Sequence, residues 1–306
     1  MAIIESTATS TSHRRILPKG ARRLADDAVA ECLERARLEA TDLDLLVNAG
    51  IYRENNLAEP ALASMIQEDV GANPSPSGEP SHGTFSFDVA SGGSGVITAL
   101  EIIDGLIASR VIDVGAVVAS DSNPGNVEAF PFPNAGGAVL LRAGPAGTGF
   151  VAFQFDTFPE FSESFESVIV WHERSHPLPW MPEGKNILEI RIGEDFAPSA
   201  VACATVSARR FLAARGLDPG DVDLLVASAY PRTFAAALAG NLGLAPDSVA
   251  APNEEFAGAH TAGVIASLDA AVRSGRLFAA KNALLVAAGA GITVATALYR
   301  HPRDSA

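Results

Sequence analysis

An internal repeat is the feature that most constrains the fold of this chain. Residues 25–50 read ADDAVAECLERARLEATDLDLLVNAG, and residues 202–229 read ACATVSARRFLAARGLDPGDVDLLVASA. Each copy joins helix-like spacing of apolar residues to a short polar turn and then to Asp-x-Asp-Leu-Leu-Val, which is typical of a strand buried on both faces. Such self-similarity predicts two halves with the same architecture.

A second pair of segments extends the repeat. Residues 95–121 read GVITALEIIDGLIASRVIDVGAVVASD, and residues 263–289 read GVIASLDAAVRSGRLFAAKNALLVAAG. In both, a helix follows a glycine-containing turn and an apolar strand comes after it. Helices that alternate with such strands predict a mostly parallel sheet covered on both sides. We therefore expect an α/β protein whose duplicated halves stack as a five-layered α/β/α/β/α sandwich.

A dinucleotide-binding Rossmann fold is the alternative for this alternation of strands and helices. That fold needs G-x-G-x-x-G directly after its first strand and an acidic residue about 20 positions later. Residues 48–51 (Asn-Ala-Gly-Ile) do not supply the motif, and the glycine-rich residues 91–95 do not stand in a suitable position. We set this alternative aside.

Composition excludes several classes of protein. The 306 residues are 48% hydrophobic and 19% charged, as in globular proteins, and the net charge of -14 disfavours binding to nucleic acid. No apolar run approaches the roughly 20 residues of a membrane span, and the first residues do not resemble a signal peptide. Cys32 and Cys203 are the only cysteines. We expect a cytoplasmic protein with both of them in the core, on equivalent helices.

Four segments are expected along the chain: an N-terminal tail (1–20), a first half (21–148), an insert (149–198) and a second half (199–306). In the insert, predicted strands at 150–155 and 186–192 flank an irregular stretch of about 30 residues. Loops of this length often cover a functional site or contact a partner.

A polar cluster lies in the insert between Trp171 and Trp180. Its members are His172, Glu173, Arg174 and His176. Two histidines four residues apart can bind a metal when they lie on a helix. Pro177 and Pro179 argue against a helix and no third ligand is evident, so we expect no metal. The tryptophans more simply anchor the insert or contact a partner.

Four motifs resemble those of the β-ketoacyl-ACP synthase III family of the thiolase superfamily. FDVASGGSG at 87–95 is similar to the family's Phe-Asp-(hydrophobic)-x-x-Ala-Cys-Ser-Gly, and residues 288–293 to its Gly-Gly-Gly-(hydrophobic)-Thr loop. Residues 223–228 stand where the family has a strand ending in Pro-His-Gln-Ala-Asn, and residues 258–263 where it has Gly-Asn-Thr-Ser. The likeness implies the thiolase fold, although the family's first strand and early helix look largely missing.

The resemblance carries catalytic positions onto this chain. The family's nucleophilic cysteine falls at Gly93, and its histidine falls at Ser228. Its asparagine falls at Ala259 without a gap, or at His260 with a shift of one residue. Glycine and serine cannot replace a thiolate and an imidazole. The backbone amides of Gly93 and Ala290 would still form an oxyanion hole, or the glycines only permit tight packing.

Residues beside these positions would contact substrate by the same resemblance. They are Ser94, Ala259, Gly289 and Gly291. For Ser94 we expect the role of a helix cap rather than that of a nucleophile. His260 would be either a buried packing residue or a general base.

Two functions follow from the resemblance. The first is a noncatalytic subunit of a dimer with an active ketosynthase homologue, in fatty-acyl or polyketide-type metabolism, although a homodimer stays open. The second is an acyltransferase or hydrolase that uses His260 as its base and forms no acyl-enzyme. In both, a CoA or phosphopantetheine thioester, supplied as acyl-CoA or on acyl carrier protein, is the ligand and no cofactor is needed. We favour the first because the chain departs from the family at two catalytic positions or more.

Overall fold

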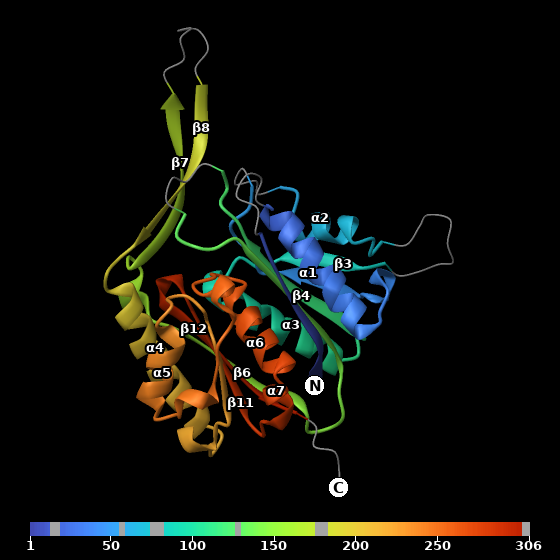
Figure 1. Cartoon of the computed structure of the whole chain (residues 1–306), viewed down its shortest axis with the longest axis vertical. Helices are drawn as coiled ribbons and strands as arrows, with labels where there is room; N and C mark the ends of the chain where they lie inside the picture. The colour runs from blue at the N-terminus through green and yellow to red at the C-terminus, as the bar shows by residue number, and fades with distance from the viewer. Residues whose placement is uncertain (13–18, 55–58, 74–82, 126–129, 175–182, 302–306) are drawn as a thin grey trace.

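The computed structural model of the protein describes residues 1–12, 19–54, 59–73, 83–125, 130–174 and 183–301. In this part of the chain, two five-stranded sheets and their helices form the body of the molecule, and a two-stranded hairpin extends away from it (Figure 1). The two halves are built in the same way, with the same order of strands in each sheet.

The two five-stranded sheets have equivalent strand orders. The first sheet has the order β1-β5-β4-β2-β3 and consists of β1 (Ala2–Thr11), β2 (Leu45–Asn48), β3 (Phe85–Asp88), β4 (Val114–Asp121) and β5 (Ala135–Ala143). The second has the order β6-β12-β11-β9-β10 and consists of β6 (Gly149–Thr157), β9 (Leu224–Ala227), β10 (Val249–Ala250), β11 (Ala283–Gly289) and β12 (Thr293–Arg300). β5 and β12 are antiparallel to both of their neighbours, whereas the other pairs are parallel. The matching orders confirm the predicted duplication.

Helices form three layers around the two sheets (Figure 1). α1 (Ala21–Ala36) and α2 (Leu62–Asp69) cover the outer face of the first sheet, and α4 (Phe196–Ala213) and α5 (Phe234–Leu242) cover that of the second. α3 (Gly95–Ala108) and α6 (Gly263–Arg273), followed by the short α7 (Arg276–Ala279), lie between the sheets. The five-layered α/β/α/β/α arrangement of the thiolase fold is therefore confirmed.

Strand β2 shows how the apolar runs produce these layers. Because successive side chains of a strand point to opposite faces, Leu45 and Val47 enter the middle core with α3 and α6, while Leu46 enters the outer core with α1. All three are at most 1% exposed. A strand covered on both faces needs apolar residues at every position, which is why the repeated segments do not alternate.

The repeated Asp-x-Asp has a structural explanation in both halves. The first aspartate of each pair, Asp42 or Asp221, accepts a hydrogen bond from the backbone nitrogen three residues earlier at 2.8 Å and closes a short turn. The second, Asp44 or Asp223, accepts hydrogen bonds from two successive backbone nitrogens at the start of the neighbouring strand, at 2.7–2.9 Å. The motif thus sets the entry of β2 and β9 into their sheets.

Two of the expected boundaries are wrong. Residues 2–11 of the supposed tail form β1, which pairs with β5, so the first strand is present. Ser and Thr conceal it in the sequence, because Ser6 and Thr7 are buried and donate hydrogen bonds to Cys32 O and Asp269. The strand predicted at 150–155 exists as β6, but it belongs to the second sheet rather than to an insert.

The rest of the expected insert is mostly regular. β7 (Phe165–Arg174) pairs antiparallel with β8 (Glu183–Ile192), so the irregular stretch predicted before residue 186 is wrong over most of its length. His172 lies in a strand, which excludes the helical spacing considered for it and His176. His176 and Trp180, with the side chains of residues 172–174, lie outside the described residues. Where the structure does describe side chains, it has no group of three or more His, Cys, Asp or Glu that could hold a metal.

The cysteines occupy equivalent helices, α1 and α4, and both are free and buried, as predicted. Burial raises the pKa of the Cys32 thiol to about 12 and also raises that of Cys203. Neither thiol therefore forms a thiolate readily near neutral pH. None of the helices described is long and apolar enough to span a membrane.

Candidate functional site

The turn at the position of the family's nucleophile is a 3-10 turn, Gly92–Ser94, between β3 and α3. A Cβ atom added to Gly93 would lie 2.4 Å from the carbonyl oxygen of Ala288 and 3.2 Å from its carbonyl carbon. Non-bonded carbon and oxygen atoms do not approach so closely, so a side chain at residue 93 needs a shift of the backbone. The end of β11 therefore fills the place of a side chain at this position.

The loop after β11 packs backbone to backbone against the same turn. A Cβ on Gly289 would lie 3.1 Å from the nitrogen of Gly93 and 3.3 Å from that of Ser94. Gly92 has φ +54°, in the left-handed region that glycine adopts without steric cost. The amides expected to form an oxyanion hole, on Gly93 and Ala290, thus belong to two segments in close contact, and Ala290 is exposed.

Ser228, at the histidine position, is brought to the same place. It follows β9, is 3% exposed, and its Oγ accepts a hydrogen bond from the nitrogen of Ala288 at 3.3 Å. The nitrogen of Ala288 thus donates to Ser228, and its carbonyl faces the position that a side chain at residue 93 would take. Gly93 and Ser228, which the resemblance assigns to two catalytic positions, therefore lie on either side of Ala288.

The other predicted contact residues are mostly inaccessible. Ser94 is fully buried, and its hydroxyl donates to the carbonyl of Ser91 at 2.6 Å instead of capping α3. The cap prediction is wrong because the tight turn brings that carbonyl within reach. Ala259 is also fully buried, in a small apolar cluster with Phe256. Gly291 has φ +86° and is partly exposed, whereas Gly289 is buried.

His260 lies in an aromatic cluster at the junction of the halves. Its ring stacks on Phe132 at 4.6 Å between centroids and contacts Tyr52 and Phe165 at 5.2 and 5.7 Å. Its Nδ1 is 3.8 Å from Oδ2 of Asp121, and the residue is 6% exposed. Burial lowers the pKa of His260, although Asp121 acts in the opposite sense, so the imidazole is neutral near pH 7.

Asp121 is a buried acceptor that the sequence analysis missed. Its Oδ1 accepts hydrogen bonds from the nitrogens of Ile51 and Tyr52, and its Oδ2 accepts from the nitrogen and hydroxyl of Thr261. It thereby ties the first half to the second. An aspartate at the end of a largely apolar strand was the available signal, because a charge is buried at such a place only when donors surround it.

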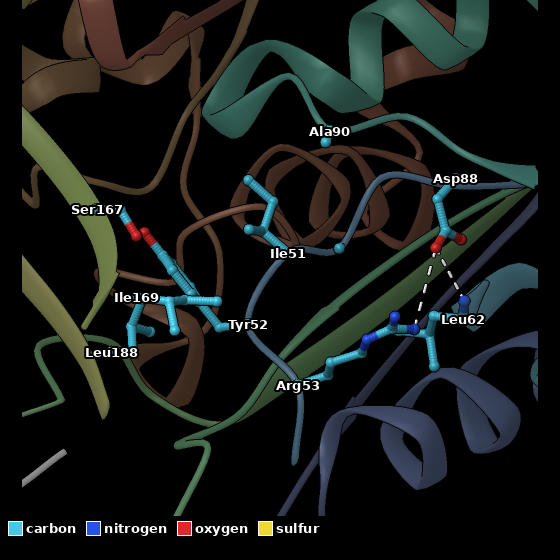
Figure 2. Close-up of a pocket in the computed structure, with 10 residues that line it drawn as sticks. Ile51, Tyr52, Arg53, Leu62, Asp88, Ala90, Ser167, Ile169 and Leu188 are labelled. Carbon is cyan, nitrogen blue, oxygen red and sulfur yellow. Dashed lines mark hydrogen bonds and ion pairs between the residues drawn. The ribbon is translucent and has the colours of Figure 1, made fainter. Parts of the chain in front are cut away.

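A cavity of about 440 Å³ lies beside this region, under the base of the hairpin (Figure 2). Residues 50–53 after β2, Leu62, Asp88 and Ala90 line it from the first half, and Ser167, Ile169 and Leu188 line it from β7 and β8. Among its lining residues are none of the predicted catalytic positions. Sequence analysis missed Tyr52 and Arg53, and it quoted Asp88 within a motif without giving it a role.

Asp88 and Arg53 form the polar end of this cavity. Asp88 accepts hydrogen bonds at 2.8 Å from the nitrogens of Leu62 and Ala63, which begin α2, and one from Asn48 at 3.1 Å. A guanidinium nitrogen of Arg53 lies 4.0 Å from the same carboxylate. Figure 2 shows Arg53 directed toward Asp88, with the hydroxyls of Tyr52 and Ser167 facing one another farther along the cavity.

Comparisons with known proteins agree with this fold. The family model for the C-terminal part of 3-oxoacyl-[acyl-carrier-protein (ACP)] synthase III matches residues 212–301. The β-ketoacyl-[acyl-carrier-protein] synthases III of Actinobacillus succinogenes and Acidiphilium cryptum are 24% and 26% identical, over 90% and 97% of this chain and 82% and 89% of their own. The crystal structure of 3-oxoacyl-[acyl-carrier-protein] synthase III from Aquifex aeolicus superposes with a TM-score of 0.80 at 20% identity, covering 98% of this chain and 100% of that one.

The protein is thus a member of the thiolase-fold class, with two equivalent halves and a junction where their strand ends meet. Within that class it is similar to β-ketoacyl-[acyl-carrier-protein] synthase III along nearly its whole length.

Proposed function

We propose that this chain is a synthase III-like subunit without a nucleophile of its own, which acts as the noncatalytic partner of a cysteine-containing homologue. The observation that carries the proposal is that a Cβ added at residue 93 would lie only 2.4 Å from the Ala288 carbonyl oxygen. A covalent acyl-enzyme needs a thiolate at the start of α3, and here even a methyl group does not fit.

Neighbouring side chains support the proposal. The hydroxyls of Ser94 and Ser228 are buried and already hydrogen-bonded, and within the described part of the chain neither is hydrogen-bonded to an imidazole. Burial raises the pKa values of both cysteine thiols. None of these groups has the activation that a serine or cysteine nucleophile requires.

The second function considered from sequence would use His260 as a base for direct attack on a thioester. A neutral imidazole suits a base, but His260 is 6% exposed and packed between aromatic rings. We therefore leave that function out of the proposal. Acyl-CoA or acyl carrier protein would be engaged chiefly by the active partner.

Two measurements test the proposal. Affinity purification from the native host, followed by mass spectrometry, is expected to recover a homologue that has the Cys-His-Asn triad. Incubation of the isolated chain with acyl-CoA is expected to give no acylated peptide and no condensation product, with the recovered homologue as the positive control. A covalently acylated peptide from this chain, or a stable homodimer that does not bind any such homologue, would contradict the proposal.

A further inference from the structure

The cavity under the hairpin has a polar end and an apolar wall, and it does not contain the degenerate catalytic positions. We propose that it binds an uncharged amphiphile, which presents a carbonyl oxygen to the polar end beside Arg53 and lays an alkyl body along Ile169 and Leu188. This site goes beyond the proposed function, since a noncatalytic subunit does not need one.

Donors dominate the polar end of the cavity. Both oxygens of Asp88 accept hydrogen bonds, one from Asn48 and Ala63 and the other from Leu62, and the Arg53 guanidinium lies beside them. The acceptor capacity of this carboxylate is thus largely used by protein groups. A guanidinium only donates. A ligand that enters here is therefore matched when it supplies an acceptor.

The hydroxyls of Tyr52 and Ser167 add a second polar point. They face one another (Figure 2), and burial raises the pKa of Tyr52 to about 12. The phenol therefore stays protonated and remains a donor at any physiological pH. When one hydroxyl of such a pair donates to the other, the second still has a proton for a ligand oxygen.

The apolar wall comes from both halves of the molecule. Ile51 and Leu62 belong to the first half, and Ile169 and Leu188 come from the hairpin. Leu62 and Leu188 are 1% and 5% exposed, whereas Ile169 is 56% exposed at the mouth of the cavity. A volume of about 440 Å³ is within the range of small-molecule sites, which bind mainly through apolar walls and a few placed polar groups.

The negative charges of the protein favour a ligand with a carbonyl group over one with a carboxylate. Arg53 is already paired with Asp88, so a ligand carboxylate would lie close to a second anion and share one cation with it. The net charge of -14 adds long-range repulsion. A ketone, amide or ester oxygen accepts the same hydrogen bonds without either cost.

Binding of two probes of equal chain length tests the ligand class. Isothermal titration of the full chain, in the assembly in which it is purified, would use 2-nonanone and nonanoate. We expect 2-nonanone to bind with one site per chain and nonanoate to bind more weakly by about tenfold or more. Absence of 2-nonanone binding, or binding of nonanoate that is equal or tighter, would overturn the proposal.

Two variants test the location. Ile169→Trp fills the cavity mouth from an exposed position, so the chain should fold, and we expect it to weaken 2-nonanone binding by about tenfold or more. Val168→Trp is the matched control, because Val168 precedes it on β7, is 39% exposed and does not line the cavity. Equal effects of the two variants, or none from Ile169→Trp, would place the ligand elsewhere. Co-purification of an active homologue does not depend on these results, so the two proposals can fail separately.

Discussion

At the junction of the two halves, the end of a strand in one half meets the start of a helix in the other, and this happens twice. We call these two contacts crossings, and they differ in the groups that meet there. The repeat aligns Thr261 with Gly93, since each lies two residues before a helix, and Asp121 with Gly289, since each ends a strand. At one crossing, Asp121 accepts two hydrogen bonds from Thr261. At the other, Gly93 meets the backbone of Ala288 and Gly289 directly.

This difference teaches that the two halves can share the same backbone path while different groups make the contact at each crossing. At the Asp121 crossing, the carboxylate of Asp121 lies between the segments and accepts hydrogen bonds from neutral donors of both halves. The absence of side chains lets the segments touch at the Gly93 crossing. The same pair of strand end and helix start can therefore serve as a buried polar link or as a close backbone contact.

Removal of the Asp121 carboxylate should have the largest effect. For Asp121→Ala we expect the free energy of unfolding to fall by about 3–5 kcal/mol, because each buried donor left without an acceptor costs about 1–3 kcal/mol. Chemical denaturation measures this. Asp113→Ala is the control, since Asp113 is exposed directly before β4 and should change little. Similar losses in the two variants would mean that Asp121 does not hold the halves together.

Addition of a methyl group at the Gly93 crossing should have the second largest effect on stability. We expect Gly93→Ala to lower the free energy of unfolding by about 1–3 kcal/mol through overpacking against the Ala288 carbonyl. Gly105→Ala lies on the adjoining α3, where a Cβ would meet nothing within 4 Å, and it should stabilise by about 0.5–1 kcal/mol. Equal signs for these two variants in denaturation experiments would refute the close contact at residue 93.

Substitution of the equivalent aspartates Asp44 and Asp223 should lower stability by similar amounts, whereas substitutions at the two crossings should differ. Asp44→Ala and Asp223→Ala each remove an acceptor for two backbone nitrogens at the start of the neighbouring strand. Thermal unfolding should reveal losses of about 1–2 kcal/mol in each case. A large difference between the two variants would show that the halves are less equivalent in energy than in shape.

A pH-dependent contribution from His260 should be the smallest effect. Because its folded pKa lies below the unfolded value near 6.5, its contribution to stability is present above that value and is lost as pH falls below it. His260→Phe should therefore reduce the loss of stability between pH 8 and pH 5, measured by denaturation at both values. An unchanged pH dependence would indicate that the imidazole is protonated equally in both states.

Much of the fold could be predicted because its signals are local. Apolar runs in residues 45–47 and 224–226 marked buried strands, and the repeat marked two equal halves. β1 was missed because Ser6 and Thr7 look like residues of a solvated tail, yet partners on α1 and α6 accept their hydrogen bonds. β7 was missed because aromatic and polar residues interrupt its pattern.

The candidate site was predicted in part for the same reason. Gly93 and Ser228 were located through motifs that are contiguous in sequence, and both do lie against Ala288. The group of Tyr52, Asp121 and His260 was not foreseen as a unit, because its members come from segments up to 208 residues apart. No pattern of neighbouring residues in the sequence indicates which strand ends lie together in the fold.

By itself, the sequence determined the layered α/β fold and the residue types at the positions that the resemblance assigns to catalysis, since both depend on short-range periodicity and on motifs read in order. Only the tertiary structure decided that the carbonyl of Ala288 occupies the place of a side chain at residue 93, and that Asp121 joins the halves. Steric exclusion and hydrogen bonding act over a few ångströms in space, and the folded chain alone brings such distant residues within that range.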